Sequence, residues 1–220
     1  MKKTLFALAL VAAPFASFAS ESNGLDYTYV QLDGIYRDAS GFYGTGAGLS
    51  GSYAVTDNVF LTGSYARVGD THSWGWSDEL YRYSHHGKDT LSAWTLGVGF
   101  NQSLADRADW VTQVAYVRPG AKWNESDCYY YGGISEGCDR WSGNDHASGY
   151  NVSTGVLGHV TNELTANAYL GYEDYNHHYD GNFFADFGVG YAFNKTWSLQ
   201  TGVRLAEGSE TWKLGVRASF

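Results

Sequence analysis

Beyond its first nineteen residues, this sequence lacks any long hydrophobic run. A transmembrane helix needs roughly 20 consecutive apolar residues, so we expect no membrane-spanning helix there. The chain is also poor in proline, with Pro14 and Pro119 alone, and in Lys and Arg, with 14 against 23 Asp and Glu. Without basic clusters, nucleic acid is not an expected partner. Aromatic residues make up 17% of the chain, which is too many for a disordered protein and favours short strands.

The N-terminus has the pattern of a secretory signal. In MKKTLFALALVAAPFASFAS, two lysines precede a short apolar run, and Ser17 and Ala19 occupy the minus-three and minus-one places of a cleavage site. We therefore expect residues 1–19 to be removed, leaving one domain over residues 20–220; a lone N-terminal anchor is the disfavoured alternative. Loss of Lys2 and Lys3 takes the formal net charge from −9 to −11. The sequence thus predicts an exported, acidic chain.

Apolar and polar or tiny residues alternate along most of the remaining chain. The closing stretch TWKLGVRASF shows this period of two, which is typical of a β-strand with two unlike faces. Similar segments of about ten residues are the signature of transmembrane barrel strands. The sequence therefore predicts an all-β, antiparallel up-and-down barrel of ten strands, with eight as the rival count. The expected strands lie near residues 26–36, 44–56, 58–68, 91–103, 110–118, 148–160, 164–175, 183–193, 197–206 and 211–220.

A soluble β-sandwich would show the same alternation, but three features favour a barrel in lipid. The polar face is rich in Gly and Ser, as a narrow lumen requires. Large aromatics stand near the strand ends on the apolar face, as in interfacial girdles. Expected connections alternate between short and long, as they do when the two rims of a barrel face different compartments. We therefore expect the apolar face to contact lipid.

Four stretches carry a resemblance to a known family: LDYTYVQLDGIYRD, SYAVTDNVFLTGSYARV, LGYEDYN and KTWSLQTGVRLAEGSETWKLGVRASF. They resemble a family of small Gram-negative outer-membrane β-barrels discussed in connection with outer-membrane vesicles, cell–cell signalling and plant immune recognition. The resemblance implies an outer-membrane barrel with no established catalytic activity. The chain end also looks like the C-terminal aromatic signature read by the barrel assembly machinery, which here would comprise Trp212, Leu214, Val216, Ala218 and Phe220.

Two segments, near residues 70–89 and 119–147, do not fit the lipid-facing pattern and are expected to be long extracellular loops. The second contains both cysteines, Cys128 and Cys138. An exported protein reaches an oxidising compartment, so we expect a disulfide that holds this loop in shape. A reactive thiol pair is the disfavoured alternative, because the spacing is not C-x-x-C.

Histidines and carboxylates in these connections raise the question of a metal or catalytic site. Neighbouring histidines on a flexible loop lack the fixed spacing of a zinc site, and no serine-elbow or other catalytic motif occurs. We therefore expect no catalytic residue, no metal site and no cofactor, and treat an enzyme as the weaker alternative. The residues considered are His72, Ser84, His85, His86, His146, Asp174, His177 and His178.

Aromatic residues in the two expected loops are candidates for partner contact. They supply large contact area at low entropic cost, although packing of the loops against each other, or contact with lipopolysaccharide, is the simpler interpretation. These residues are Trp74, Trp76, Tyr81, Tyr83, Tyr129, Tyr130, Tyr131 and Trp141.

Charged residues recur on the polar, lumen-facing side of the predicted strands. Buried charges are tolerated only when they are paired and hydrogen-bonded, so we predict an ion-pair network across the lumen; independently solvated charges in a wet lumen are the alternative. The network would comprise Asp33, Glu173, Asp186, Arg204, Lys213 and Arg217, with Gln31, Asn101, Gln113 and Gln200 nearby.

Taken with the small barrel, these charges predict a lumen that is plugged or leaks only slightly, since barrels of about eight strands are filled by their own side chains. The leading hypothesis is a non-enzymatic outer-membrane barrel that displays surface loops. The alternative is a narrow pore for small solutes or ions. Expected partners are outer-membrane lipid, lipopolysaccharide, the assembly machinery during biogenesis, and an external protein or glycan.

Overall fold

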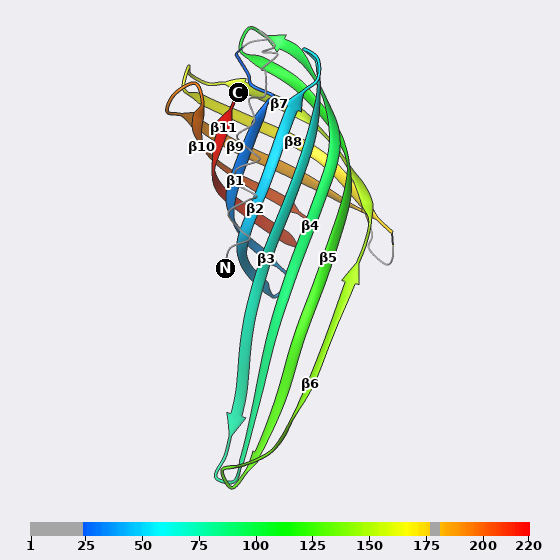
Figure 1. The fold of residues 1–220 in the computed structure, drawn as a ribbon, viewed down its shortest axis with the longest axis vertical. Helices are drawn as coiled ribbons and strands as arrows, with labels where there is room; N and C mark the ends of the chain where they lie inside the picture. The colour runs from blue at the N-terminus through cyan, green and yellow to red at the C-terminus, as the bar shows by residue number, and fades with distance from the viewer. Residues whose placement is uncertain (1–23, 177–180) are drawn as a thin grey trace, which may run out of the picture.

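The computed structural model describes residues 24–176 and 181–220, which form eleven antiparallel strands (Figure 1). Within these residues, no helix is long and apolar enough to cross a membrane. The strands are β1 (Tyr29–Ala39), β2 (Phe42–Ala54), β3 (Val59–Ser77), β4 (Tyr81–Ala105), β5 (Ala108–Tyr131), β6 (Ile134–His146), β7 (Gly149–His159), β8 (Leu164–Tyr175), β9 (Asn182–Ala192), β10 (Trp197–Ala206) and β11 (Ser209–Ser219).

Ten of the strands close into a ring. Each pairs with its sequence neighbour, except that β5 pairs directly with β7, and β1 pairs with β11 to close the barrel. The predicted ten-stranded up-and-down barrel is therefore confirmed. β6 is an eleventh strand that pairs with β5 outside the ring.

The outer wall of the barrel is apolar because alternate side chains point away from the ring. Leu170 and Leu214, for example, are 67% and 58% exposed. Large rings gather near both ends of the wall, as the sequence predicted. Phe100, Trp110, Phe193, Trp197 and Phe220 lie at the end that carries turns 55–58, 106–107, 160–163 and 193–196, here called the turn end, and Trp94, Tyr116, Tyr150, Tyr172, Phe183 and Trp212 lie toward the opposite rim.

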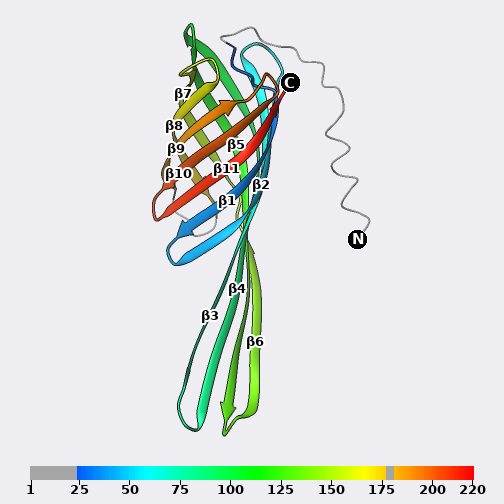
Figure 2. The same cartoon turned by 90° about the vertical axis from the view of Figure 1, so that its left-hand side faces the viewer.

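The two segments expected to be loops are instead β-strands. β3 loses β2 as a partner beyond Gly69, and β5 leaves β7 beyond Val117. Past these points β3, β4, β5 and β6 continue as one four-stranded sheet that protrudes far beyond the ring (Figure 2). We call this sheet, comprising residues 70–77, 81–89, 120–131 and 134–146, the extension.

The loop prediction was wrong because residues in these segments do not alternate between apolar and polar, which was the pattern used to predict strands. Ser, Thr, His and Gly alternate there with Trp and Tyr, which does not resemble a lipid-facing strand. Thr, Tyr and Trp nevertheless favour extended backbone, and aromatic pairs across neighbouring strands stabilise a sheet. Among the other connections at that rim, 40–41 and 207–208 have two residues each, and 176–181, between β8 and β9, has six. The asymmetry between the rims therefore comes mainly from the length of β3, β4, β5 and β6.

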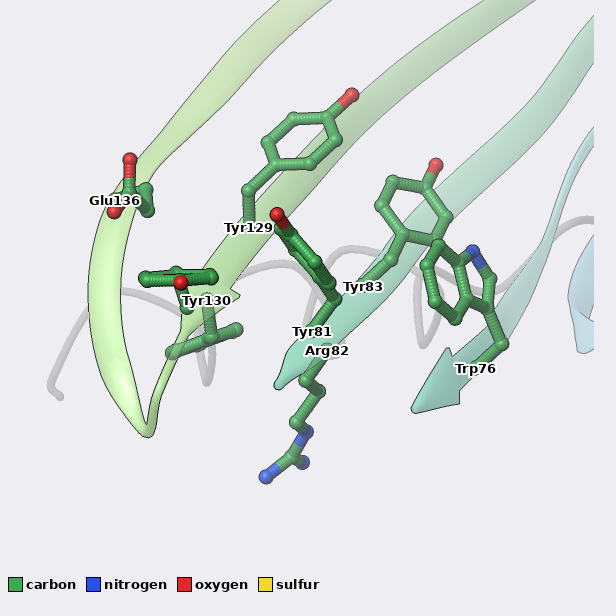
Figure 3. Close-up of a pocket in the computed structure, with 8 residues that line it drawn as sticks. Trp76, Tyr81, Arg82, Tyr83, Tyr129, Tyr130 and Glu136 are labelled. Carbon is green, nitrogen blue, oxygen red and sulfur yellow. The ribbon is translucent and has the colours of Figure 1, made fainter. Parts of the chain in front are cut away.

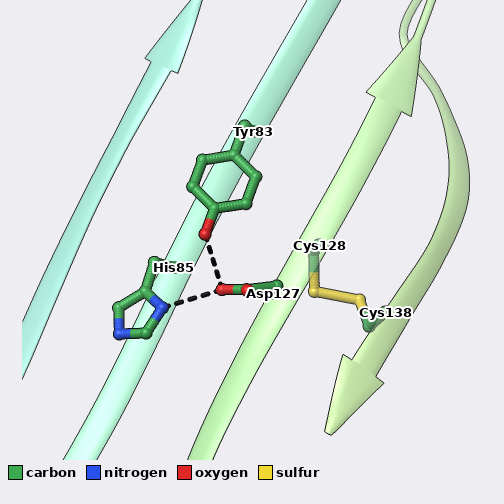
Figure 4. Close-up of a disulfide and its surroundings, with 5 residues drawn as sticks. All are labelled: Tyr83, His85, Asp127, Cys128 and Cys138. Atoms are coloured by element: carbon green, nitrogen blue, oxygen red, sulfur yellow. Dashed lines mark hydrogen bonds and ion pairs between the residues drawn. A yellow bond between two sulfur atoms is a disulfide. The ribbon is translucent and has the colours of Figure 1, made fainter.

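The far tip of the extension is held by a turn and a disulfide. Gly132 and Gly133 connect β5 to β6 with φ of 56° and 83°, in the left-handed region that glycine adopts without strain. Cys128 and Cys138 lie opposite each other on these two strands, with Cα atoms 4.1 Å apart, and form the predicted disulfide (Figure 4). The disulfide thus fixes β6 to β5, its one partner strand within the described residues.

The seam between β1 and β11 generates a stability prediction. A Cβ atom at Gly215 would overlap Leu32 O and the Asp33 side chain, so we expect Gly215→Ala to lower the free energy of unfolding by about 1–3 kcal/mol through overpacking. Gly34→Ala on the same seam is the matched control, because its Cβ would meet only Leu214 O at 3.6 Å. Urea unfolding of the refolded barrel measures both; equal effects would contradict the close packing at this seam.

Candidate functional sites

Three adjacent strands place one ion cluster in the lumen. Arg204 on β10 donates from Nε and Nη2 to the two carboxylate oxygens of Asp186 on β9, at 2.8 and 2.7 Å. Its Nη1 lies 3.6 Å from Glu173 Oε2 on β8. The guanidinium also stacks over the buried Phe184 ring, 4.1 Å from the ring centre. This two-pronged geometry fixes the plane of the guanidinium across the inside of the wall.

The other three charges predicted for the network do not join this cluster directly. Arg217 donates to Gln31 Oε1 at 2.8 Å and lies over the Tyr29 ring at 3.9 Å, while the Gln31 amide donates to Asp33 Oδ1 at 2.7 Å. Gln31 therefore stands between Arg217 and Asp33. Lys213 is exposed to the lumen, and within the described part of the chain it has no ion-pair partner within 4.0 Å. The described part of the chain thus shows two separate groups and one lysine outside both.

A segment that the sequence analysis placed partly in the first strand crosses the inside of the barrel. Residues 24–28 precede β1, which begins at Tyr29 rather than near residue 26. Gly24 O accepts from His159 on β7 at 3.1 Å, and the Tyr27 hydroxyl donates to Asp109 on β5 at 2.8 Å. At its other end, Thr28 contacts β2 through the Ala54 amide. β5 and β7 lie across the ring from β1, so residues 24–28 span the lumen. We call these residues the strap.

Apolar side chains surround the strap at the turn end. Tyr27 stacks on Phe60 with ring centres 4.8 Å apart, and both side chains are buried. The cluster also contains Leu25, Ala54 and Val111, with Leu157 and Tyr169 packed against it. Sequence reasoning missed this cluster, although one signal was present: Phe60 and Val111 are apolar residues at lumen-facing positions.

The extension has two chemically different faces. Residues directly opposite one another in the register share a face, and successive residues on one strand alternate between faces. One face, here called the aromatic face, carries every aromatic residue predicted for partner contact except Tyr130, and also Trp123. Its rings are Trp74, Trp76, Tyr81, Tyr83, Trp123, Tyr129, Tyr131 and Trp141.

Rings on the aromatic face contact one another across strands. Tyr83 lies 5.1 Å from Trp74 and 5.3 Å from Tyr129 between ring centres. At the tip, Tyr83 and Tyr129 border a hollow of about 420 Å³, which is also lined by Trp76, Tyr81, Arg82, Tyr130, Tyr131 and Glu136. Figure 3 shows Trp76, Tyr83 and Tyr129 projecting from three successive strands, with Arg82 extending away from them. The aromatic face is thus a pre-formed, open platform.

One carboxylate on this face is firmly held. Asp127 Oδ1 accepts from the Tyr83 hydroxyl at 2.7 Å and lies 2.7 Å from His85 Nδ1 (Figure 4). The Tyr83 hydrogen bond, followed by the His85 contact, holds the pKa of Asp127 below its usual value, and the same bond raises the pKa of Tyr83 to about 12. This hydrogen-bonded triad orients the phenol and the imidazole.

The histidines and other polar residues considered earlier do not form a shared site. His72 and His85 stack on the aromatic face with ring centres 5.6 Å apart, whereas His86 and Ser84 lie on the opposite face. His177 and His178 lie outside the described residues. Among the described residues, no group of three metal-ligating side chains comes together.

No known protein-family profile matches this chain, and no curated protein matches its sequence. Among solved structures, it is similar to the KdgM porin in complex with disordered oligogalacturonate (11% identity, 87% of this chain and 99% of that chain, TM-score 0.48). It is also similar to the NanC porin (10%, 87% and 100%, 0.47) and to Ail, the attachment invasion locus protein of Yersinia pestis (14%, 87% and 95%, 0.38). Similarity at this level assigns no function.

The Arg204 cluster generates the prediction for the lumen. Arg204→Met leaves Asp186 and Glu173 without their shared cation. Their side chains are only 26% and 15% exposed, so we expect the free energy of unfolding to fall by about 1–3 kcal/mol. Urea unfolding should also show that adding Asp186→Asn and Glu173→Gln restores most of the loss.

Lys213→Met is the control for a lumen cation without an ion pair, and we expect a change within about 0.5 kcal/mol. A loss as large as that of Arg204→Met would indicate that the overall charge of the lumen matters rather than this cluster.

Proposed function

We propose that this chain is a non-enzymatic outer-membrane β-barrel with a closed lumen, and that it holds the extension outside the cell to contact a partner. The apolar outer wall supports the membrane assignment. A closed ring satisfies its own backbone hydrogen bonds, as a membrane requires, and lipid would cover its exposed Leu, Val and Phe side chains. Aromatic rings near both ends match the two interfaces.

Orientation follows from the same proposal. Outer-membrane barrels have short turns on the periplasmic side and longer structures outside. The turn end therefore faces the periplasm, and the extension faces outward. Export through a cleaved signal over residues 1–19, contact with lipopolysaccharide and recognition of the β11 terminus by the assembly machinery belong to this proposal, as do the vesicle and signalling links of the resembling family.

The strap supports a closed lumen. Ten-stranded barrels have little free interior, because their size lies close to that of barrels filled by side chains. Here the strap crosses that interior and packs Leu25 and Tyr27 against inward side chains such as Phe60 and Val111, which are 2% and 1% exposed. Such packing leaves little room for solute passage at the turn end.

The extension carries the proposed activity. Trp74 and Trp76 are 57% and 55% exposed, although they stand on a sheet fixed by backbone pairing and a disulfide. Exposed apolar patches of this kind mark interaction sites more often than inert surface. This exposed, pre-formed aromatic face is the observation that supports contact with an external partner.

A narrow pore is the second candidate, favoured by Lys213. Its exposure places solvent in part of the lumen, and glycine-rich inward positions leave space along the wall. Ion passage would then require the strap to leave the turn end.

Electrical recording separates these two functions. In planar bilayers, refolded protein comprising residues 20–220 is expected to give no steady conductance. Tyr27→Ala combined with Phe60→Ala removes two stacked rings from the closure, so brief current steps are expected to appear. Leu170→Ala, on the lipid-facing wall, is the control and should stay silent. Discrete, ion-selective steps from the unaltered protein would contradict a closed lumen and favour the pore.

A further inference from the structure

The two faces of the extension differ in charge as well as in aromatic content. In the paired stretches His72–Ser77, Tyr81–Asp89, Lys122–Tyr129 and Gly137–Asn144, every carboxylate lies on the aromatic face, and every Lys and Arg lies on the opposite face. The carboxylates are Asp89, Glu125, Asp127 and Asp139, and the bases are Arg82, Lys88, Lys122 and Arg140.

From this segregation we infer that the aromatic face binds an extended, Lys- or Arg-rich peptide segment. The inference rests on the proposed function, since it names the class of partner that the extension contacts. Aromatic ring faces carry negative electrostatic potential and attract ammonium and guanidinium groups. Carboxylates on the same surface add direct charge complementarity, which also steers association.

Free carboxylates are available for such a partner. Asp127 is occupied by Tyr83 and His85, and Asp89 lies 3.9 Å from His72 Nδ1. Glu125 and Asp139, by contrast, have no ion-pair partner within 4.0 Å in the described part of the chain. They lie on either side of Asp127, along β5 and across on β6. A bound cation would therefore find an acceptor beside the rings.

The spacing of the rings suits an extended peptide. Residues two apart on one strand, such as Trp74 and Trp76, or Tyr81 and Tyr83, stand about 6.8 Å apart. Side chains two apart on an extended peptide have the same repeat and point the same way. A peptide with a basic residue at every second position, laid along the strands, would place successive cations over successive rings.

The charge pattern also disfavours other partners. In the four paired stretches no Lys or Arg lies on this face, and Arg82 borders it only at the hollow of the tip. Phosphate groups, anionic polysaccharide and nucleic acid would therefore meet mainly carboxylates and ring faces, which repel them. A neutral glycan would stack on the rings, but its affinity would not depend on which face carries the Lys and Arg residues. The segregation therefore favours the cationic peptide over the glycan.

Binding is measured with the full mature chain in nanodiscs of zwitterionic lipid, using fluorescence anisotropy. The probe is a labelled peptide of four Lys-Ser repeats, compared with four Glu-Ser repeats and with a labelled neutral oligosaccharide of glucose. The Lys-Ser peptide is expected to bind and the other two are not. Trp74→Ala combined with Trp76→Ala is expected to weaken binding about tenfold through loss of cation–π contacts.

A charge-matched pair of variants tests the face itself. Glu125→Gln with Asp139→Asn removes two negative charges from the aromatic face and is expected to weaken binding about three- to tenfold. Lys122→Gln with Arg140→Gln removes two positive charges from the opposite face and should change binding by less than about twofold. If binding instead depends on the net charge of the whole protein, Lys122→Gln with Arg140→Gln will strengthen binding by a factor similar to the loss in the first pair, and the inference fails.

Two other outcomes overturn the inference. Binding of the oligosaccharide but not of the Lys-Ser peptide would assign the face to a glycan. Absence of binding by all three probes to folded protein would leave the face without this role. Both results are independent of conductance: an open pore would contradict the closed lumen of the proposed function and leave peptide binding to the extension unaffected.

Discussion

The pairing of β4 with β5 is the constraint on which both parts of this molecule depend. One antiparallel ladder runs from Tyr81 opposite Tyr131 at the far tip to Ala105 opposite Ala108 at the turn end, with an irregularity only near Ser103. The same two strands are therefore barrel wall at one end and extension at the other. Since side chains alternate with a fixed period of two, the lumen-facing side of the wall continues without a break into the aromatic face.

This continuity explains how a small barrel presents a large rigid surface. A long loop would need its own core and would lose conformational entropy on binding. The extension has already lost that entropy, because backbone hydrogen bonds, the Cys128–Cys138 disulfide and the glycine turn fix it during folding. Among the residues that the structure describes, the outer edges of the extension on β3 and β6 have no pairing partner. Few residues of the extension are therefore irregular, and its exposed rings stand on paired strands.

The sequence predicted the ring well and the rest poorly, for physical reasons. Strands β8 and β10 were predicted at the residues where they occur, 164–175 and 197–206, because lipid on one side and a lumen on the other impose a clear apolar–polar alternation. Past Gly69 and Val117 the strands leave the ring and that alternation is lost, so the sequence of these segments resembled loops. Part of the strap was predicted as strand, because Leu25 and Tyr27 alternate with Asp26 and Thr28. Its path inside the barrel depends on contacts with distant strands, which alternation does not specify. Alternation predicted that Arg204, Asp186 and Glu173 point into the lumen. The distances between their charged groups depend on the stagger of the strands, which alternation does not specify.

Hydrogen exchange of the backbone amides tests most directly whether the extension is a rigid continuation of the barrel. For the folded chain in lipid, the account predicts slow exchange along β4 and β5 from the barrel through residues 82–88 and 122–130, with fast exchange limited to the turns at 78–80 and 132–133. Fast exchange throughout 70–89 and 119–147, beside a protected barrel, would contradict it. Those segments would then be mobile loops, and the aromatic face would not exist as a fixed surface.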